Sequence, residues 1–408
     1  MPPVLTARPT VPASRRPPPP LGAGIPKRVR GTLRHAAPAL LGYLAVRLLA
    51  LAVLIRWTHL KGHGVWPLLA NGWDSRWYLG IADGGYGYEP ALDPSPDFGP
   101  GFGPGASVGP RNLAFFPLYP ALVKAVAAVT PGSRASVGLI LAVLCSLIAA
   151  WGIFAVGDRL YGRRVGTVLA VLWGSLPVAA VQWMGYTESL FTALAAWALY
   201  AAMDKRWAWA AGLAVGAGLT RPTGVAVAAA VTVAALLAAR RGSRPALAAA
   251  LVAPLGWLGY VGWVGLRLGR WDGYFAVQKE WSNEWDGGSV TLRKLRGHLV
   301  YAEEPKLFLV MVSLTLIVAA ALFALCLADR QPVLLLVFSG VLLLVVLGSG
   351  GVYFPRARFL LPGFPLLLPL ALAICRARRH VAALVLAGAA LSSAWLGGHM
   401  LLIWNGPP

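Results

Sequence analysis

Residues able to do acid–base or anion-binding chemistry occur in a few short segments of this chain, each beside an apolar stretch. In NGWDSRWYLGIADGGYGY, Asp74 directly follows Trp73, and Arg76 and Tyr78 come next. A carboxylate near a membrane interface is a candidate to accept a proton, and the neighbouring aromatic rings could stack on a sugar or anchor at the interface. A helix cap or a solvated loop acid is the alternative interpretation of Asp74.

Two further segments each contain one charged residue among apolar neighbours. Glu188, in GYTESLF, stands where an apolar helix is expected to begin, as a helix cap or as a functional carboxylate at membrane depth. Arg221, in GLTRPTGV, has no basic neighbours and needs an anionic partner, which could be Glu188, Asp74 or a ligand phosphate. A structural ion pair is the alternative for Arg221.

The remaining candidates are aromatic and basic. RNLAFFPLYP contributes Tyr119, as a substrate contact or a membrane anchor, and FAVQKEW contributes Lys279 as a substrate contact. VYFPRARFLLPGFP contributes Arg356 and Arg358, whose placement indicates an anion, either a ligand phosphate or a lipid headgroup. Arg47 lies inside the first apolar stretch, as a buried partner or a snorkelling residue.

The elements that position these residues are predicted from composition. The chain has 408 residues, of which 58% are hydrophobic and 12% charged, against about 45–50% and about 25% in soluble domains. This composition argues against a soluble enzyme, a disordered chain and a disulfide-rich secreted domain, and the three cysteines all lie in apolar stretches. The apolar runs predict an all-α polytopic membrane protein with about eleven transmembrane helices, at 37–56, 135–156, 165–182, 187–203, 207–220, 222–239, 245–267, 306–327, 331–348, 359–375 and 381–403.

The chain has a net charge of +21, and the distribution of its charged residues among the loops indicates how the chain is oriented in the membrane. If the run 113–130 lies along the membrane as an interfacial or re-entrant helix, the N-terminal tail and the loops on its side of the membrane together hold 19 basic and three acidic residues. This arrangement predicts a cytoplasmic N-terminus, an extracytoplasmic C-terminus, contact with membrane lipids and no nucleic-acid partner. All the candidate segments named above then meet the extracytoplasmic face.

The predicted organisation is a disordered, basic, proline-rich cytoplasmic tail at 1–35 followed by a single integral membrane domain at 36–408. Two large extracytoplasmic loops are expected, at 57–134, with interfacial helices, and at 268–305. Residues 84–110, rich in glycine and proline, are expected to form a mobile loop that serves as a lid or as a plain connector.

Carboxylates, isolated arginines and aromatics on one membrane face suit sugar transfer from a polyprenyl-phosphate donor. The leaving phosphate is already ionised, so a base need only take the proton from the acceptor hydroxyl. Neither a DxD motif nor a histidine cluster occurs, so no metal and no cofactor are expected. A secondary transporter or lipid flippase of the cell envelope is the main alternative, and a scaffold for an envelope complex is a third.

Four motifs in this order, WDSRWYLGIADGGYGY, AFFPLYP, GYTESLF and LTRPTGV, resemble the PIG-V-type mannosyltransferases. These are relatives of GPI mannosyltransferase II in the GT-C glycosyltransferase superfamily. The resemblance covers about residues 40–230, with weaker similarity in FAVQKEW and PRARFLLPGFP. It implies a GT-C-like fold, polyprenyl- or dolichyl-phosphate-mannose as donor, and inverting α-mannosyl transfer on the extracytoplasmic face, with Asp74 as the base.

One departure from the family bears on the acceptor. Eukaryotic members usually carry serine and asparagine after the arginine, whereas Arg221 is followed by Pro222 and Thr223. This difference disfavours a GPI precursor as acceptor. The composition, rich in alanine, glycine and arginine, suggests a bacterium, so the resemblance implies a bacterial inner-membrane enzyme acting on a lipid-linked or cell-envelope glycan.

Overall fold

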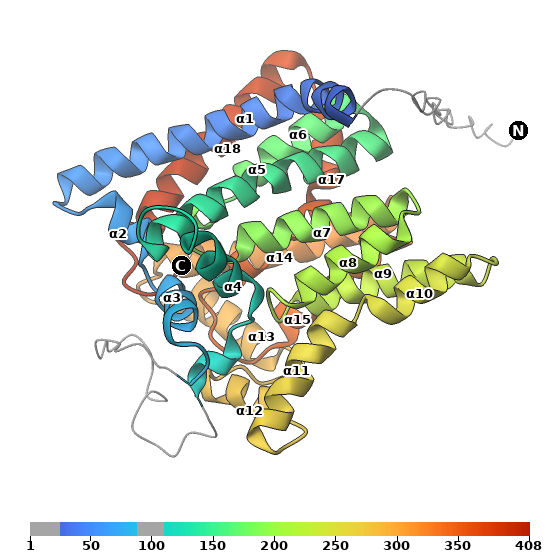
Figure 1. Ribbon diagram of the computed structural model, residues 1–408. Helices are drawn as coiled ribbons and strands as arrows, with labels where there is room; N and C mark the ends of the chain where they lie inside the picture. Colours follow the sequence, from blue (N-terminus) through green and yellow to red (C-terminus); the bar gives the residue numbers. More distant parts are fainter. Residues whose placement is uncertain (1–24, 88–109) are drawn as a thin grey trace, which may run out of the picture.

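The computed structural model describes residues 25–87 and 110–408, and within these ranges every regular element is a helix, apart from one isolated β-bridge (Figure 1). This confirms the all-α class for the described part of the chain. Five helices there are long and apolar enough to cross a membrane, as a polytopic membrane protein requires. They are Gly31–Leu60 within α1 (Ile25–Leu60), α5 (Arg134–Tyr161), Arg244–Leu268, α14 (Leu307–Ala328) and α18 (Arg379–Leu402).

The other predicted spans coincide with shorter helices, so the total of eleven stays a prediction. These helices are α6 (Arg163–Gly174), α7 (Glu188–Met203), α8 (Trp207–Gly218), α9 (Gly224–Ala239), α15 (Val333–Gly348) and α17 (Leu368–Arg376). With a rise of about 1.5 Å per residue, helices of this length fall short of a hydrocarbon core about 30 Å thick.

Prolines divide three predicted spans, because a proline inside a helix lacks the N–H of the backbone ladder. α6 ends before Pro177, and the 3₁₀ helix η2 (Ala179–Trp183) follows it. The span at 245–267 consists of α10 (Arg244–Val252) and α11 (Leu255–Leu268), which meet at Pro254. The span at 359–375 begins irregularly and continues through the 3₁₀ helix η4 (Phe364–Leu367) into α17.

The bundle is centred on α5, which packs against α6 and α7, while α1 packs against α6 and α18. Beyond α7, the helices α8, α9 and α10 continue the bundle toward the lower right of Figure 1, and α15 packs against α9. Small residues permit the closest approaches. A Cβ atom added to Gly166 of α6 would stand 2.8 Å from the backbone nitrogen of Asp158 in α5, so these helices contact each other through backbone.

Both predicted extracytoplasmic loops contain helices. The segment 57–134 contains α2 (Val65–Ala70), α3 (Asp74–Gly84), the 3₁₀ helix η1 (Arg111–Ala114) and α4 (Leu118–Ala127). The segment 268–305 contains α12 (Gly273–Glu280), α13 (Ser289–Arg296) and the π-helical turn η3 (Gly297–Tyr301). The ten-residue α4 falls inside the run expected to lie along the membrane and packs on α3 and α5.

Two predictions fall partly outside the described residues. Residues 88–109 of the loop expected at 84–110 are not described, and neither are residues 1–24 of the expected tail. Helix α1 begins at Ile25 and therefore includes the last part of the segment 1–35.

Candidate functional site

Two carboxylates and two arginines meet where helices begin or turn. Asp74 is the first residue of α3 and Glu188 is the first residue of α7. Arg221 lies in the turn between α8 and α9, and Arg358 lies in the short helix α16 (Arg356–Phe359). A carboxylate at a helix N-terminus is stabilised by the helix dipole, so the positions of both acids are favourable locally.

The four side chains form a chain of alternating charge. Arg358 Nη2 donates a hydrogen bond to Asp74 Oδ2 at 2.5 Å, and Arg358 Nε lies 3.8 Å from Glu188 Oε1. Arg221 Nη1 lies 2.6 Å from the same Glu188 oxygen and donates to Thr187 Oγ1 at 2.9 Å. Glu188 is therefore the anionic partner that the isolated Arg221 requires, and the four formal charges cancel, as buried charges must.

Asp74 is the most accessible member of this network. The side chains of Glu188, Arg221 and Arg358 are 2%, 9% and 5% exposed, whereas that of Asp74 is 23% exposed. The Arg358 guanidinium stands over the ring of Tyr186, and its buried Nη1 has no hydrogen-bond partner among the described residues. The network thus exposes one carboxylate, that of Asp74, next to an arginine whose buried Nε and Nη1 have no hydrogen-bond partner among the described residues.

A cavity of about 620 Å³ opens beside the network, within the range of roughly 300–1,000 Å³ typical of small-molecule sites. Asp74, Tyr78, Arg221 and Arg358 line it. Glu188 is not among the lining residues and supports the arginines from behind. Burial raises the pKa of Tyr78, so this phenol stays neutral and acts as a hydrogen-bonding group rather than as a base.

Aromatic side chains form one wall of the same cavity. Phe115 and Trp281 line it, with their ring centroids 5.4 Å apart, and Trp77 stacks behind Phe115 at 5.5 Å. The hydroxyls of Tyr86 and Tyr260 both donate to the Phe115 carbonyl at 2.7 Å, which fixes the backbone of the AFFPLYP motif. Such a rigid aromatic surface suits stacking against a sugar ring.

The WDSRW and GYTESLF motifs touch directly. The Asp74 N–H donates to the Tyr186 hydroxyl at 3.4 Å, and a Cβ atom added to Gly185 would lie 3.1 Å from Ser75 Oγ. Trp73 adopts φ 44°, a value that non-glycine residues rarely take. The backbone immediately before Asp74 is therefore strained, and such strain often clusters at functional sites.

Arg356, expected beside Arg358 as a phosphate ligand, lies elsewhere. It is 2% exposed and does not belong to the cavity lining. Its Nη1 contacts Thr291 of α13, and its Nη2 donates to the carbonyls of Ser349 at 2.5 Å and Gly351 at 3.3 Å. These partners make Arg356 a tie between α13 and the segment before α16.

Four other predicted substrate contacts also lie outside the cavity lining. Trp73 packs against the core, and Arg76 is exposed and donates to the Asn71 carbonyl at 3.2 Å. Tyr119 is 2% exposed and donates to the Gly138 carbonyl at 2.8 Å. Lys279 is 69% exposed and pairs with Glu284 at 3.1 Å.

Sequence reasoning missed several lining residues. The ring centroid of Phe359 lies 5.4 Å from the guanidinium carbons of both Arg221 and Arg358. Phe359 follows Arg358 directly in the chain. Lys294 and His298 come from the second large loop, and Trp404 comes from the C-terminal segment. Phe359 belongs to the PRARFLLPGFP motif, which sequence reasoning singles out, so this motif could have indicated it. Nothing in the local sequence marks Lys294, His298 or Trp404 as lining residues.

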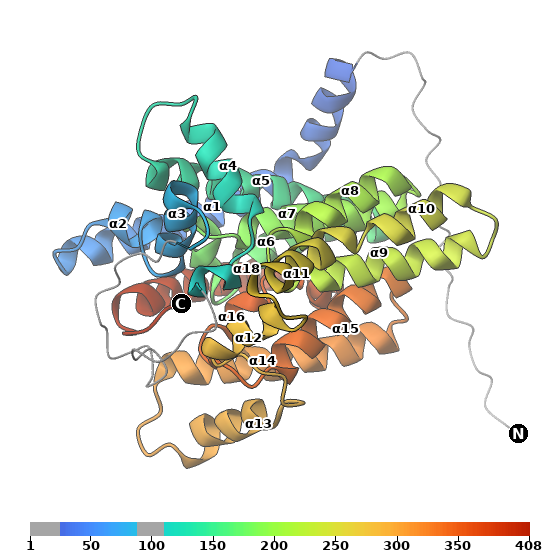
Figure 2. The same cartoon turned by 60° about the horizontal axis from the view of Figure 1, so that its bottom comes forward.

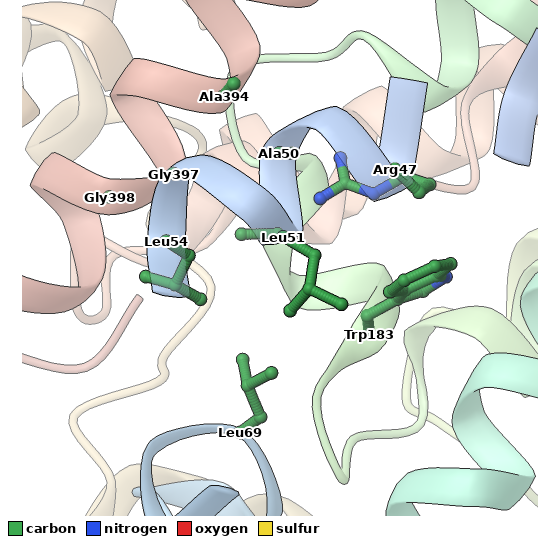
Figure 3. A pocket seen from close by; sticks show the side chains of 10 residues that line it. Arg47, Ala50, Leu51, Leu54, Leu69, Trp183, Ala394, Gly397 and Gly398 are labelled. Atoms are coloured by element: carbon green, nitrogen blue, oxygen red, sulfur yellow. The ribbon is translucent and has the colours of Figure 1, made fainter. Parts of the chain in front are cut away.

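Arg47 is buried in α1, where its Nη1 donates to the Gly174 carbonyl at 3.1 Å. Figure 3 shows it beside Trp183, with Leu51 and Leu54 on the same helix and Leu69 opposite. The space that they line measures only about 10 Å³, about one water molecule. It is therefore too small for a sugar or a lipid chain, and Arg47 is a buried backbone partner rather than a snorkelling residue.

Within residues 25–87 and 110–408, no group of three or more histidine, cysteine, aspartate or glutamate side chains is arranged to hold a metal ion.

Over the described residues, these features define a helical protein with membrane-length helices and a charged, aromatic cavity at helix ends. Residues 112–260 match the family model described as dolichyl-phosphate-mannose-protein mannosyltransferase, and no curated protein sequence matches the chain. The matched region includes Phe115, Glu188 and Arg221. The similarity supports a membrane glycosyltransferase of the GT-C type, of the mannosyltransferase kind, and does not distinguish the PIG-V-type family within that class.

Proposed function

We propose that this protein is an inverting mannosyltransferase that uses polyprenyl-phosphate-mannose and acts on a lipid-linked or cell-envelope glycan at the extracytoplasmic face of the membrane. The observation that carries the proposal is the juxtaposition of Asp74 and Arg358 in one cavity, with an Nη2–Oδ2 distance of 2.5 Å. A proton acceptor and a phosphate-binding cation are the two groups that this reaction requires.

In the proposed reaction, Asp74 accepts the proton of the acceptor hydroxyl. The hydroxyl oxygen forms a bond to the anomeric carbon of mannose while the bond from that carbon to the phosphate oxygen breaks. The electron pair of the broken bond leaves with the polyprenyl phosphate, whose added charge Arg358 and Arg221 stabilise. Attack opposite the leaving group inverts the configuration and gives an α-mannoside from a β-linked donor.

The arrangement around Arg358 supports its role as a phosphate ligand. Its Nη1 is a buried donor without a partner among the described residues, and unsatisfied buried donors are costly unless a ligand completes them. The Glu188 carboxylate lies behind both guanidiniums and keeps them in place. Phe115 and Trp281 provide the surface on which the mannose ring stacks.

The proposed orientation draws support from the placement of the basic turns. The α9–α10 turn, which includes Arg240 and Arg241, lies at the right edge of Figure 1, whereas α2 and α3 lie at the left. Basic turns at one end of the bundle and the site at the other agree with a cytoplasmic and an extracytoplasmic side.

Transfer assays test the proposal. The purified protein in phosphatidylcholine nanodiscs is given radiolabelled polyprenyl-phosphate-mannose and lipid extract of the source organism, without nucleotide sugar. We expect label in a product that α-mannosidase releases. Absence of a labelled product, together with lipid flux across proteoliposomes that lack donor, would favour the transporter alternative instead.

A further inference from the structure

A second group of basic residues borders the cavity away from Asp74. Lys294 of α13 and His298 of η3 both line the cavity, together with Trp404. Lys306 Nζ stands 5.8 Å from the centroid of the Trp404 ring. These four side chains, here called the basic rim, come from elements that take no part in the Asp74 network.

The two lysines of the basic rim have no carboxylate partner at ion-pair distance among the described residues. Neither Lys294 nor Lys306 forms an ion pair with any described residue. The carboxylate of Asp286, just before α13, accepts hydrogen bonds from the backbone N–H groups of Val290 at 2.7 Å and Gly288 at 2.8 Å, not from either lysine. Burial lowers the pKa of His298, and the nearby charges of Lys294 and Lys306 lower it further, so the imidazole sits in a positive local field.

The rim lies at a distance from the reacting end of the cavity. Figure 2 shows α13 well separated from α3, which begins with Asp74. Lys294 is exposed, so this part of the cavity is open to an elongated molecule. The segment 284–286 holds α13 in this place through backbone hydrogen bonds, from Asp286 to Gly348 at 3.1 Å and from Gly350 to Glu284 at 2.5 Å.

We infer that the basic rim is a second anion subsite, which binds a phosphate or carboxylate group carried by the acceptor. This inference rests on the proposed function. The donor phosphate must adjoin the anomeric carbon, and therefore Asp74, where Arg358 and Arg221 receive it. An anion at the rim must then belong to the other substrate, so the acceptor is an acidic glycolipid or an acidic glycan.

The subsite is tested by separating acceptors according to charge. Lipid extract of the source organism is divided by anion exchange into neutral and acidic fractions. Each fraction is offered, with labelled polyprenyl-phosphate-mannose, to the protein in nanodiscs of phosphatidylcholine alone. We expect the label in the acidic fraction. Lys294→Gln should raise the acceptor KM roughly tenfold and leave the donor KM unchanged, as expected when one charge-assisted hydrogen bond is lost from a partly exposed site.

Neighbouring variants provide matched controls. Arg293→Gln removes one positive charge from the same helix at an exposed position outside the cavity lining, and should leave both KM values unchanged. Lys294→Arg should keep acceptor binding. Equal effects of Lys294→Gln and Arg293→Gln, or transfer confined to the neutral fraction, would overturn the inference while the proposed function stands.

A further arm separates the acceptor from bulk anionic lipid as the source of the anion. Phosphatidylglycerol is added to the nanodiscs at constant acceptor. If it changes the rates of the wild type, Lys294→Gln and Arg293→Gln in parallel, the basic face of α13 responds to surface charge and the subsite is refuted. Failure of the wild type to transfer to either fraction would refute the proposed function and this inference together.

Discussion

The buried charge network makes a prediction about stability that does not depend on knowing the substrates. Glu188→Gln keeps the size of the side chain and removes the charge shared by Arg221 and Arg358. The Glu188 side chain is 2% exposed and its Oε1 lies 2.6 Å from Arg221 Nη1, so the variant leaves a buried guanidinium without its counter-ion. Breaking a buried pair in this way costs about 3–5 kcal/mol of unfolding free energy.

The measurement is equilibrium unfolding in mixed micelles with increasing dodecyl sulfate, followed by tryptophan fluorescence. The double variant Glu188→Gln/Arg221→Gln removes both charges of the closest pair and should be more stable than Glu188→Gln alone. The exposed pair of Arg159 and Asp204, 53% and 22% exposed, is the control. Asp204→Asn should cost no more than about 1 kcal/mol, as for most surface ion pairs.

Two results would refute this reasoning. If Glu188→Gln costs as little as Asp204→Asn, Glu188 does not compensate a buried charge. If the double variant loses as much as the two single variants summed, Glu188 and Arg221 do not interact.

Three further predictions concern individual residues. Arg358→Lys should lower kcat/KM for the donor at least tenfold with the fold retained, because lysine lacks the second guanidinium donor, and unchanged donor kinetics would contradict a phosphate-binding role. Arg356→Gln should lower the thermal midpoint without a selective effect on donor KM, because its partners are Thr291 and backbone carbonyls; a rise in donor KM alone would return Arg356 to the site. The backbone N–H groups of Val290 and Gly288 hold the pKa of Asp286 below its ordinary value, so its stabilisation is fully present above pH about 3.9 and is lost as pH falls through the folded-state pKa. Asp286→Asn should therefore lower the thermal midpoint at pH 7 and have little effect in strong acid, and an equal deficit at both pH values would contradict this origin.

The sequence predicted the helical class and the need of Arg221 for an anionic partner, because both depend on local signals. Apolar runs identify buried helices, and an arginine isolated between two such runs requires a counter-ion. This argument singles out Arg221 but leaves Glu188, Asp74 and a ligand phosphate as possible partners, and the folded structure places Glu188 beside it. Helix continuity was less predictable, since Pro177 and Pro254 interrupt runs whose mean hydropathy alone indicates unbroken spans.

The details of the site depended on packing that the local sequence does not encode. Arg356 and Arg358 are two residues apart and carry the same side chain. Arg356 nevertheless ties α13 to the segment before α16, whereas Arg358 pairs with Asp74. The direction in which each side chain leaves α16 decides between these two roles, and residues two apart on a helix point to different sides. Lys294 and Trp404 enter the cavity from distant segments for the same reason, since only the folded chain brings them together.

The central role proposed for Asp74 is tested most directly by single-turnover transfer from polyprenyl-phosphate-mannose, with wild type and Asp74→Asn compared at equal amounts of folded protein. The matched control is Asp83→Asn, on the same helix, which changes an exposed carboxylate that pairs with Arg134. We predict that Asp74→Asn binds donor but transfers at least 100-fold more slowly, in line with the contribution of roughly 10²–10⁴-fold from a general base, and that Asp83→Asn transfers normally. Transfer at the wild-type rate by Asp74→Asn would contradict the assignment of the base.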